Sequence, residues 1–201
     1  MDLTTLMMTF RSDLRKELRA GRRALSSEQQ VRAGLGLADV LLRQPFVAKS
    51  QHIAVYLAND GEIDPSSLMA QLWKQGKQCY LPVLDSQGSR SLLFVPYCSD
   101  TVLVNNKFGI PEPVPDPAER IAPRDLDLVL MPLTGFDEHG QRLGMGGGFY
   151  DKTFDFIRTT QKPPLVGLAH ECQKVDRIPT ENWDIPMQGV ATDKCYYRAK
   201  S

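Results

Sequence analysis

Residues 131–151, MPLTGFDEHGQRLGMGGGFYD, decide which fold this chain adopts. The apolar run at 128–131 leads into this stretch and predicts a buried strand. Phe149, Phe154 and Ile157 at its far end predict the apolar face of a helix. Glycines gather between the two, although each costs about 0.5–1 kcal/mol relative to alanine inside regular structure. This order of strand, glycine loop and helix indicates an α/β fold whose backbone comes close to a ligand.

We expect the glycine loop to bind an anion. Arg142 precedes the glycines and a predicted helix N-terminus follows them, which is the setting of many phosphate sites. The loop is not a P-loop, because no G-x-x-x-x-G-K-[ST] fits it. It is not a dinucleotide fingerprint either, because Phe149 stands three positions after Gly146. On these residues alone, a phosphate-binding loop and a mobile surface loop both remain open.

The overall composition restricts the classes of function. A chain of 201 residues has room for one well-cored domain. Its 24 basic and 24 acidic residues cancel, so no net charge attracts nucleic acid or an anionic membrane. We therefore expect a local anion site and no nucleic-acid or membrane partner. No apolar run approaches a membrane span, and residues 1–10 lack the leading positive charge of a secretory signal.

The cysteines and histidines predict neither a disulfide framework nor a zinc site. The four cysteines are far apart without a C-x-x-C pair, and the three histidines show no zinc-ligand spacing. Free thiols in a reducing cytosol are the simplest interpretation, so we expect a cytoplasmic protein.

A long helix is predicted over residues 3–23. Apolar side chains recur there at helical spacing and make one stripe: Met7, Phe10, Leu14 and Leu18. Arginines make a second stripe on another face: Arg11, Arg15, Arg19 and Arg22. Such a stripe is either a solvated basic face, which the pattern alone favours, or a set of guanidinium groups that grip phosphates bidentately.

A second helix follows a capping box formed by Ser26 and Gln29, and Pro45 ends it. Its expected buried face consists of Val31, Leu35, Ala38 and Leu42. Beyond it, strands are predicted at 52–57, 78–83, 92–95, 164–169 and 190–192, the last being the final strand. Residues 105–117 are too proline-rich for regular structure. Glu62 comes just after the carboxyl end of a strand, where open α/β sheets bind ligands, although a lone loop glutamate is more often a surface group.

Several motifs in one order resemble a known family. The most specific part runs from Gly135-Phe136-Asp137 to Phe149-Tyr150-Asp151, and supporting pieces lie at 11–15, 61–63, 108–113 and 179–184. Over nearly the whole chain these residues are similar to the 5-formyltetrahydrofolate cyclo-ligases, also called methenyltetrahydrofolate synthetases. The resemblance implies a three-layer α/β/α sandwich around a mostly parallel sheet. It also implies one domain (1–201) whose N-terminal helical pair (1–45) packs on the α/β core.

The resemblance also implies a reaction. Members of this family use ATP and Mg²⁺ to convert 5-formyltetrahydrofolate into 5,10-methenyltetrahydrofolate, releasing ADP and phosphate. Phosphorylation turns the formyl oxygen into a leaving group, and N10 of the same folate closes the ring, so the protein mainly aligns and neutralises charge. The sequence has no Ser-His-Asp arrangement and no plausible activated cysteine, which agrees with catalysis without a covalent enzyme intermediate. We expect a monomer rather than an obligate oligomer.

Residue by residue, the resemblance implies the following site. Glu62 and Arg142 are the expected catalytic residues, and Asp151 and Asp184 are the expected magnesium ligands. Folate is expected to contact Glu62, Phe108 and Tyr150. ATP is expected to contact Arg11, Arg15, Arg142, Leu143, Gly144, Met145, Gly146, Gly147, Gly148, Phe149 and Tyr150. The chain departs from the family at Met145 and Gly147, where some members carry basic residues, and at Phe149, where tyrosine is usual.

Two other functions fit the same motifs. A regulatory protein could keep the nucleotide and folate sites but lack turnover, and a phosphosugar enzyme could use a similar layered fold. Retention of Glu62, Asp151 and Asp184 favours catalysis over binding alone.

Overall fold

The computed structural model describes residues 3–85, 89–106, 109, 111–114, 116 and 118–199. Within them, seven strands form one central sheet in the order β11-β10-β9-β6-β1-β2-β3. The strands from β10 to β2 run parallel, and the antiparallel strands β3 and β11 form the two edges. Their bounds are β1 His52–Ala54, β2 Gln78–Leu84, β3 Leu92–Tyr97, β6 Leu128–Pro132, β9 Leu165–Leu168, β10 Gly189–Ala191 and β11 Tyr196–Arg198.

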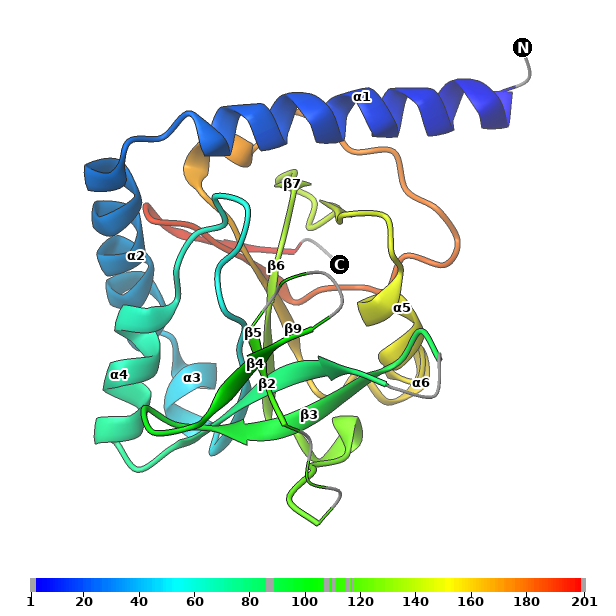
Figure 1. Ribbon diagram of the computed structural model, residues 1–201. Coiled ribbons are helices and arrows are strands. Elements are labelled where there is room, and N and C mark those ends of the chain that lie inside the picture. Colours follow the sequence, from blue (N-terminus) through cyan, green and yellow to red (C-terminus); the bar gives the residue numbers. More distant parts are fainter. Residues whose placement is uncertain are drawn as a thin grey trace.

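Helices cover both faces of the sheet (Figure 1). One face carries α2 (Ser27–Leu42), α3 (Pro45–Lys49) and α4 (Ser66–Lys74), and the other carries α5 (Phe149–Thr153) and α6 (Ile157–Thr160). Strand β6 supplies both cores by alternation, because Leu130 packs with the first set of helices and Met131 packs with the second. The predicted three-layer α/β/α architecture with a mostly parallel sheet is confirmed.

Helix α1 (Leu3–Arg23) lies across the carboxyl end of the sheet rather than on either face (Figure 1). Its Leu18 packs with Leu143 and Ile178 in a small third core. Leu143 belongs to the hairpin of β7 (Gly135–Phe136) and β8 (Arg142–Leu143), which follows β6. Helix α1 therefore covers the end of the sheet from which the glycine loop emerges.

Short elements complete the described structure. A two-stranded ladder joins β4 (Leu103–Asn105) and β5 (Pro111–Pro113), and single turns of 3-10 helix occur at η1 (Pro123–Asp125) and η2 (Glu171–Gln173). The ladder corrects the prediction that 105–117 is irregular. Proline is tolerated there because a two-stranded edge does not need every N–H. None of the described helices is long and apolar enough to cross a bilayer.

Each of the two stripes of α1 is buried in part: Leu18 of the apolar stripe is buried, and so are two of the arginines. Arg22 is fully buried and Arg11 is 7% exposed, whereas Met7 and Phe10 of the apolar stripe are exposed. The interpretation of the arginine stripe as a solvated face is therefore wrong for its buried members. Carbonyl and carboxylate oxygens accept hydrogen bonds from these guanidinium groups, which offsets the cost of burying them.

The buried face of α2 also differs from the prediction. Ala38 is buried as predicted, but Val31 and Leu35 are exposed, and Ala33, Leu37 and Leu41 are buried in their place. The reason is close packing, because a Cβ added at Gly34 would lie 2.8 Å from the carbonyl oxygen of Asp64. A glycine at position 34 allows that approach, and the apolar spacing alone does not reveal it.

Two predictions near the carboxyl end of the chain need correction. Phe154 and Ile157 are buried in one core as expected, but the helix is broken into α5 and α6 between them. The strand predicted at 190–192 exists as β10, yet β11 follows it as an antiparallel edge. With only five residues, α5 has a weaker terminal dipole than the sequence suggested.

Candidate active site

A cleft of about 540 Å³ opens beside the carboxyl ends of β1, β2 and β6, below α1. This is the location where open α/β sheets bind ligands. Its wall combines side chains from α1, the turn after β1, the glycine loop, α5 and the segment before β10. The polar and glycine residues that line the cleft are Arg11, Arg15, Tyr56, Asn59, Asp60, Glu62, Asn106, Glu112, Arg142, Gly144, Gly146, Gly147, Gly148, Tyr150, Asp151, Glu181 and Asp184.

At one end of the cleft, the glycine loop meets α1. The Nε of Arg15 donates to the carbonyl oxygen of Gly144 at 2.8 Å, and its guanidinium carbon lies 3.8 Å from where a Cβ on Gly146 would stand. Gly146 has φ 93° and Gly148 has φ 67°, conformations that favour glycine. Among the described residues, the N–H groups of 145–148 have no hydrogen-bond acceptor. This end therefore offers main-chain donors beside a guanidinium group.

Two ion pairs form the wall behind the glycine loop. Arg11 Nη1 donates to Asp184 Oδ2 at 3.0 Å and to the carbonyl oxygen of Pro179. Arg142 pairs with Asp151 and donates to the carbonyl oxygen of Ile185 at 2.5 Å. Burial lowers the pKa of Arg142, and Asp151 and Asp184 oppose that change. Arg142 is thus held by protein acceptors.

The same two aspartates are the expected magnesium ligands. The described residues contain no group of three or more His, Cys, Asp or Glu that could hold a metal. Asp151 uses Oδ1 for Arg142 and for the N–H of Ile185, and among the described residues its Oδ2 has no partner. Mg²⁺ is commonly bound by one or two carboxylates together with substrate phosphates. These residues therefore fit Mg²⁺ shared with phosphate oxygens rather than a protein-only cage.

At the other end of the cleft, Glu62 is nearly buried, with 12% of its side chain exposed. The Asn59 N–H donates to its Oε2 at 3.2 Å, and Arg22 Nη2 lies 3.7 Å from its Oε1. Burial raises the pKa of Glu62 to about 7, although Arg22 and the Asn59 N–H oppose the shift. The carboxyl group therefore titrates close to neutral pH.

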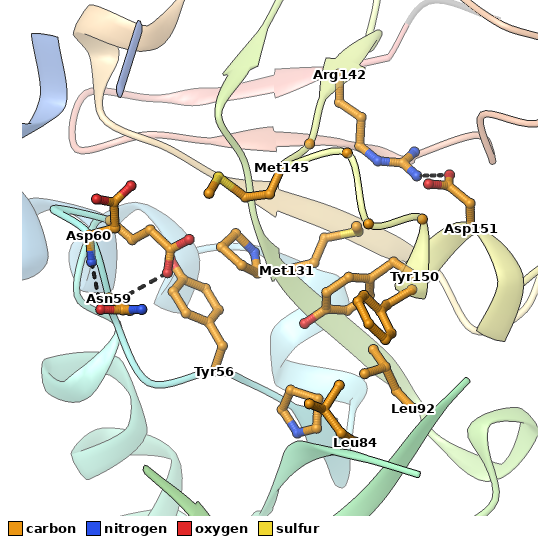
Figure 2. A pocket seen from close by; sticks show the side chains of 18 of the residues that line it. Tyr56, Asn59, Asp60, Leu84, Leu92, Met131, Arg142, Met145, Tyr150 and Asp151 are labelled. Atoms are coloured by element: carbon orange, nitrogen blue, oxygen red, sulfur yellow. Dashed lines mark hydrogen bonds and ion pairs between the residues drawn. The ribbon is translucent and has the colours of Figure 1, made fainter. Parts of the chain in front are cut away.

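Two tyrosines accompany Glu62. The hydroxyl of Tyr150 points into the cleft (Figure 2), and burial together with Glu62 raises the pKa of Tyr150. Tyr56 donates from its hydroxyl to the carbonyl oxygen of Ile63 at 2.7 Å. Both phenols therefore stay protonated, and Tyr150 keeps its hydroxyl toward the ligand space.

The structure brings most of the predicted site residues together. Arg11, Arg15, Glu62, Arg142, the glycine loop, Tyr150 and both aspartates line one cleft. Leu143 is the exception, because it is fully buried beneath α1. Phe108 lies outside the described residues. Met145 is exposed at the mouth, with its sulfur 3.4 Å from the hydroxyl of Thr134.

Sequence reasoning did not find Asp60, Tyr56 or Trp183, which also line the cleft. The turn residues at 59–61 mark a reversal of the chain but carry no sign that Asp60 pairs with α1. Trp183 is 59% exposed, and an aromatic residue in a polar loop was the available signal for it.

This fold and site define an α/β enzyme with an arginine- and glycine-lined cleft. Residues 7–193 match the model of the 5-formyltetrahydrofolate cyclo-ligase family. The chain belongs to that family, and it is an enzyme of the ligase class.

Individual relatives agree with the family match. The chain is 44% identical over 175 residues to the 5-formyltetrahydrofolate cyclo-ligase of Escherichia coli (strain K12), which covers 87% of this chain and 96% of that protein. The Haemophilus influenzae protein of the same name is 40% identical, over 88% of this chain and 94% of its own. The solution structure of Aquifex aeolicus 5,10-methenyltetrahydrofolate synthetase superposes with a TM-score of 0.81 at 32% identity, covering 95% of this chain and 93% of that one.

Proposed function

We propose that this protein uses ATP and Mg²⁺ to convert 5-formyltetrahydrofolate into 5,10-methenyltetrahydrofolate, releasing ADP and phosphate. One observation carries the proposal: the guanidinium of Arg15 lies against Gly146 in the same cleft that holds the buried Glu62. The glycine end of the cleft, which suits phosphate, and the Glu62 end, which suits a polar heterocycle, thus open into the same cavity. Family membership supports the choice of a formyl folate as the substrate.

The two ends of the cleft suit the two substrates. The unpaired N–H groups of 145–148, with Arg15 beside them, suit the triphosphate. The end formed by Glu62, Tyr56 and Tyr150 suits the pterin, because it combines flat apolar surface with a carboxyl group that can accept hydrogen bonds. Asp151 and Asp184 would hold Mg²⁺, which supplies neutralisation of phosphate charge when bound.

The proposed chemistry converts an unreactive amide into a reactive carbon. The formyl oxygen attacks the γ-phosphorus of ATP, the bond from that phosphorus to the bridging oxygen breaks, and ADP leaves. N10 then attacks the formyl carbon, the carbon–oxygen bond breaks, and phosphate leaves while N10 loses its proton. Alignment and charge neutralisation dominate such phosphoryl transfers, so pre-placed donors and arginines are the main requirement.

Glu62 receives the role of positioning the folate. A carboxyl group whose pKa is about 7 is also suited to take up a proton near neutral pH, since catalytic efficiency is greatest when the pKa lies near the working pH. Glu62 is therefore our candidate acceptor for the N10 proton. The guanidinium of Arg142 donates to Asp151 and to the carbonyl oxygen of Ile185. We therefore assign Arg142 the role of positioning Asp151 rather than the predicted catalytic role.

The test is a direct assay. Purified protein is incubated with 5-formyltetrahydrofolate, ATP and Mg²⁺, and the absorbance of the methenyl product is followed. We expect product only when all three are present. Nucleotide binding without product would favour the regulatory, binding-only alternative.

Arg15→Ala tests the phosphate end separately. Loss of a charge-assisted contact should weaken ATP binding by about tenfold without unfolding the protein. Lys16→Ala on the exposed side of α1 is the matched control, because Lys16 is itself exposed and pairs with the exposed Asp13. Equal ATP affinity in both variants would remove Arg15 from the proposed site.

We also propose that the protein works in the cytoplasm as a monomer and as a single unit. Free thiols at Cys79, Cys98, Cys172 and Cys195 suit a reducing compartment. One chain supplies the cleft from Met8 to Asp184, so no second copy is needed to build it. Sedimentation or size-exclusion measurements with and without substrates test the oligomeric state.

A further inference from the structure

Three arginines of α1 converge on a single carboxylate, that of Asp60. Arg22, fully buried, donates from Nη2 to Asp60 Oδ2 and from Nε to the Asp60 carbonyl oxygen, both at 2.9 Å. Arg19 Nε donates to the same Oδ2 at 2.8 Å, and Arg23 pairs with Oδ1. Burial opposes ionisation, but the hydrogen bonds of Arg19, Arg23 and Arg22 outweigh it and lower the pKa of Asp60 to about 2. Asp60 is therefore charged throughout the physiological range.

The backbone around Asp60 forms a tight turn. Asp60 has φ 55° and Gly61 has φ 73°, so two consecutive residues adopt the left-handed region. The turn closes on itself, because the Glu62 N–H donates to the Asn59 carbonyl oxygen at 3.0 Å while the Asn59 N–H donates to the Glu62 side chain. The position of the Glu62 carboxyl group is thus set by the conformation of this turn.

Other elements hold the same turn from outside. The amide of Gln30 on α2 donates to the Gly61 carbonyl oxygen at 3.4 Å, and the ring of His170 lies 3.2 Å from that oxygen. Figure 2 shows the Asp60 carboxylate turned away from the cleft, whereas Tyr150 points its hydroxyl into it. The Asp60 carboxylate therefore links the turn to α1 and is not directed at a ligand in the cleft.

We propose that Asp60 is a positioning residue for the reaction: held by the arginines of α1, it keeps the 59–62 turn in the shape that presents Glu62 to the folate. The inference rests on the proposed function of the cleft. It gives α1 two tasks, since Arg15 supports the glycine loop and Arg22, two turns further along the helix, supports the turn that carries Glu62. One helix thereby sets the geometry of both ends of the cleft.

The charges that face Glu62 predict how the variant behaves with pH. Arg22 and Arg19 from α1 favour its ionised form, and Asp60 disfavours it. The neighbouring Tyr56 and Tyr150 are neutral phenols whose own pKa values Glu62 raises. Asp60→Asn removes a negative charge and frees Arg22 to approach Glu62, so the pKa of Glu62 should fall.

The experiment compares Asp60→Asn with wild type in the full-length protein. We expect the KM for 5-formyltetrahydrofolate to rise about tenfold and the KM for ATP to change less than about twofold, because the contacts of Arg11 and Arg15 are untouched. The acid limb of kcat/KM for the folate should move to lower pH. Asp13→Asn is the matched control on the exposed side of the same helix.

Arg19→Gln is the second variant, which keeps the test decisive if Asp60→Asn does not fold. It removes one of three contacts at a one-third exposed side chain. The KM for the folate should rise about two- to threefold with the melting temperature nearly unchanged.

Two results overturn the inference. The first is a folate KM and a pH profile that match wild type in both variants. The second is an equal rise in the KM values for folate and ATP that follows the fall in melting temperature. That result would show that Asp60 stabilises the fold in general. Absence of product from the wild-type protein would count against the proposed function instead. Calorimetric binding of 5-formyltetrahydrofolate to wild type and Asp60→Asn would then still decide the role of Asp60.

Discussion

The two ends of the cleft are built in opposite ways. Around Glu62, protein groups already pair with one another: Arg22 is fully buried, and the side chains of Glu62 and Asp60 are 12% and 16% exposed. Around Gly146, the loop is exposed and its N–H groups have no acceptor within the described chain. The first end is thus shaped before a substrate arrives, and the second leaves its donors to the ligand. Substitutions should therefore alter chemistry and pH response at the acidic end and nucleotide affinity at the glycine end.

The largest effect is expected from Glu62→Gln. The amide keeps the shape of the side chain but cannot be ionised, so kcat/KM for the folate should fall at least about 100-fold, the lower range for losing a proton acceptor. ATP affinity, measured by calorimetry, should stay within about twofold because the glycine end is untouched. Glu28→Gln on the exposed side of α2 is the control. Similar losses for folate and ATP would show that the two ends do not act separately.

The same variant should reveal a cost of burying Glu62. Its pKa is about 7 in the folded protein against an ordinary 4.5, so between these values the folded state retains a proton that the unfolded state has lost. The free energy of unfolding therefore decreases as pH rises through this window and remains lower above it. Glu62→Gln does not lose stability in this way. Its free energy of unfolding, measured relative to that of wild type, should therefore increase by up to about 3 kcal/mol from about pH 4 to about pH 8.

Urea unfolding of both proteins at the two pH values measures this difference. Asp60 provides the internal contrast, because its lowered pKa contributes stability above its ordinary pKa of 3.8 that is lost as pH falls toward about 2. A difference between Glu62→Gln and wild type that does not change with pH would contradict the buried, protonated state of Glu62.

At the glycine end, we expect Arg142 to stabilise the fold rather than to bind the nucleotide directly. Arg142→Met leaves Asp151 without its partner and the Ile185 carbonyl oxygen without its donor. Breaking a fully buried pair costs about 3–5 kcal/mol, and because 24% of the Asp151 side chain is exposed we expect about 2 kcal/mol. Urea unfolding measures this loss. Arg158→Met breaks a pair whose Asp155 is 72% exposed and should cost less than about 1 kcal/mol. An unchanged stability with weaker ATP binding would instead make Arg142 a direct nucleotide ligand.

The difference between the two ends also explains what could be read from the sequence. The glycine loop was predictable because its distinctive residues are consecutive in the chain, and β6 and β9 were predictable as short buried apolar runs. The acidic end depends on Asp60 meeting Arg22, which is 38 positions away in the chain. No local pattern records that contact, so the solvated interpretation, which the arginine stripe favoured, is wrong for the buried Arg22.

Helical spacing failed for a related reason. In α2, Leu35 and Leu37 are equally apolar, yet only Leu37 is buried, and both Gly34 and Gly36 lie against the backbone of other segments. In α1, the exposed Phe10 and the buried Arg11 show that acceptors in the loop at 179–184 can outweigh hydropathy. Tertiary contacts of this kind lie outside any single stretch of sequence.

The smallest effect is expected from Gly146→Ala, which tests whether the loop works through its backbone shape. The φ of 93° is unfavourable for alanine, so the substitution should cost about 1 kcal/mol of stability. The new Cβ would also stand 3.8 Å from the Arg15 guanidinium carbon, in the space assigned to a phosphate. The KM for ATP should therefore rise about tenfold while the KM for the folate stays unchanged.

Gly76→Ala separates strain from function in that experiment. Gly76 has φ 72°, and a Cβ there would meet nothing within 4 Å, so alanine imposes a similar backbone cost after α4, outside the residues that line the cleft. It should lower the melting temperature about as much as Gly146→Ala and leave the KM for ATP unaltered. If both variants changed the KM for ATP equally, the loss would come from global destabilisation. If neither did, the open donors of the glycine loop would not be the nucleotide site, and the contrast between a pre-paired acidic end and a ligand-completed glycine end would have to be given up.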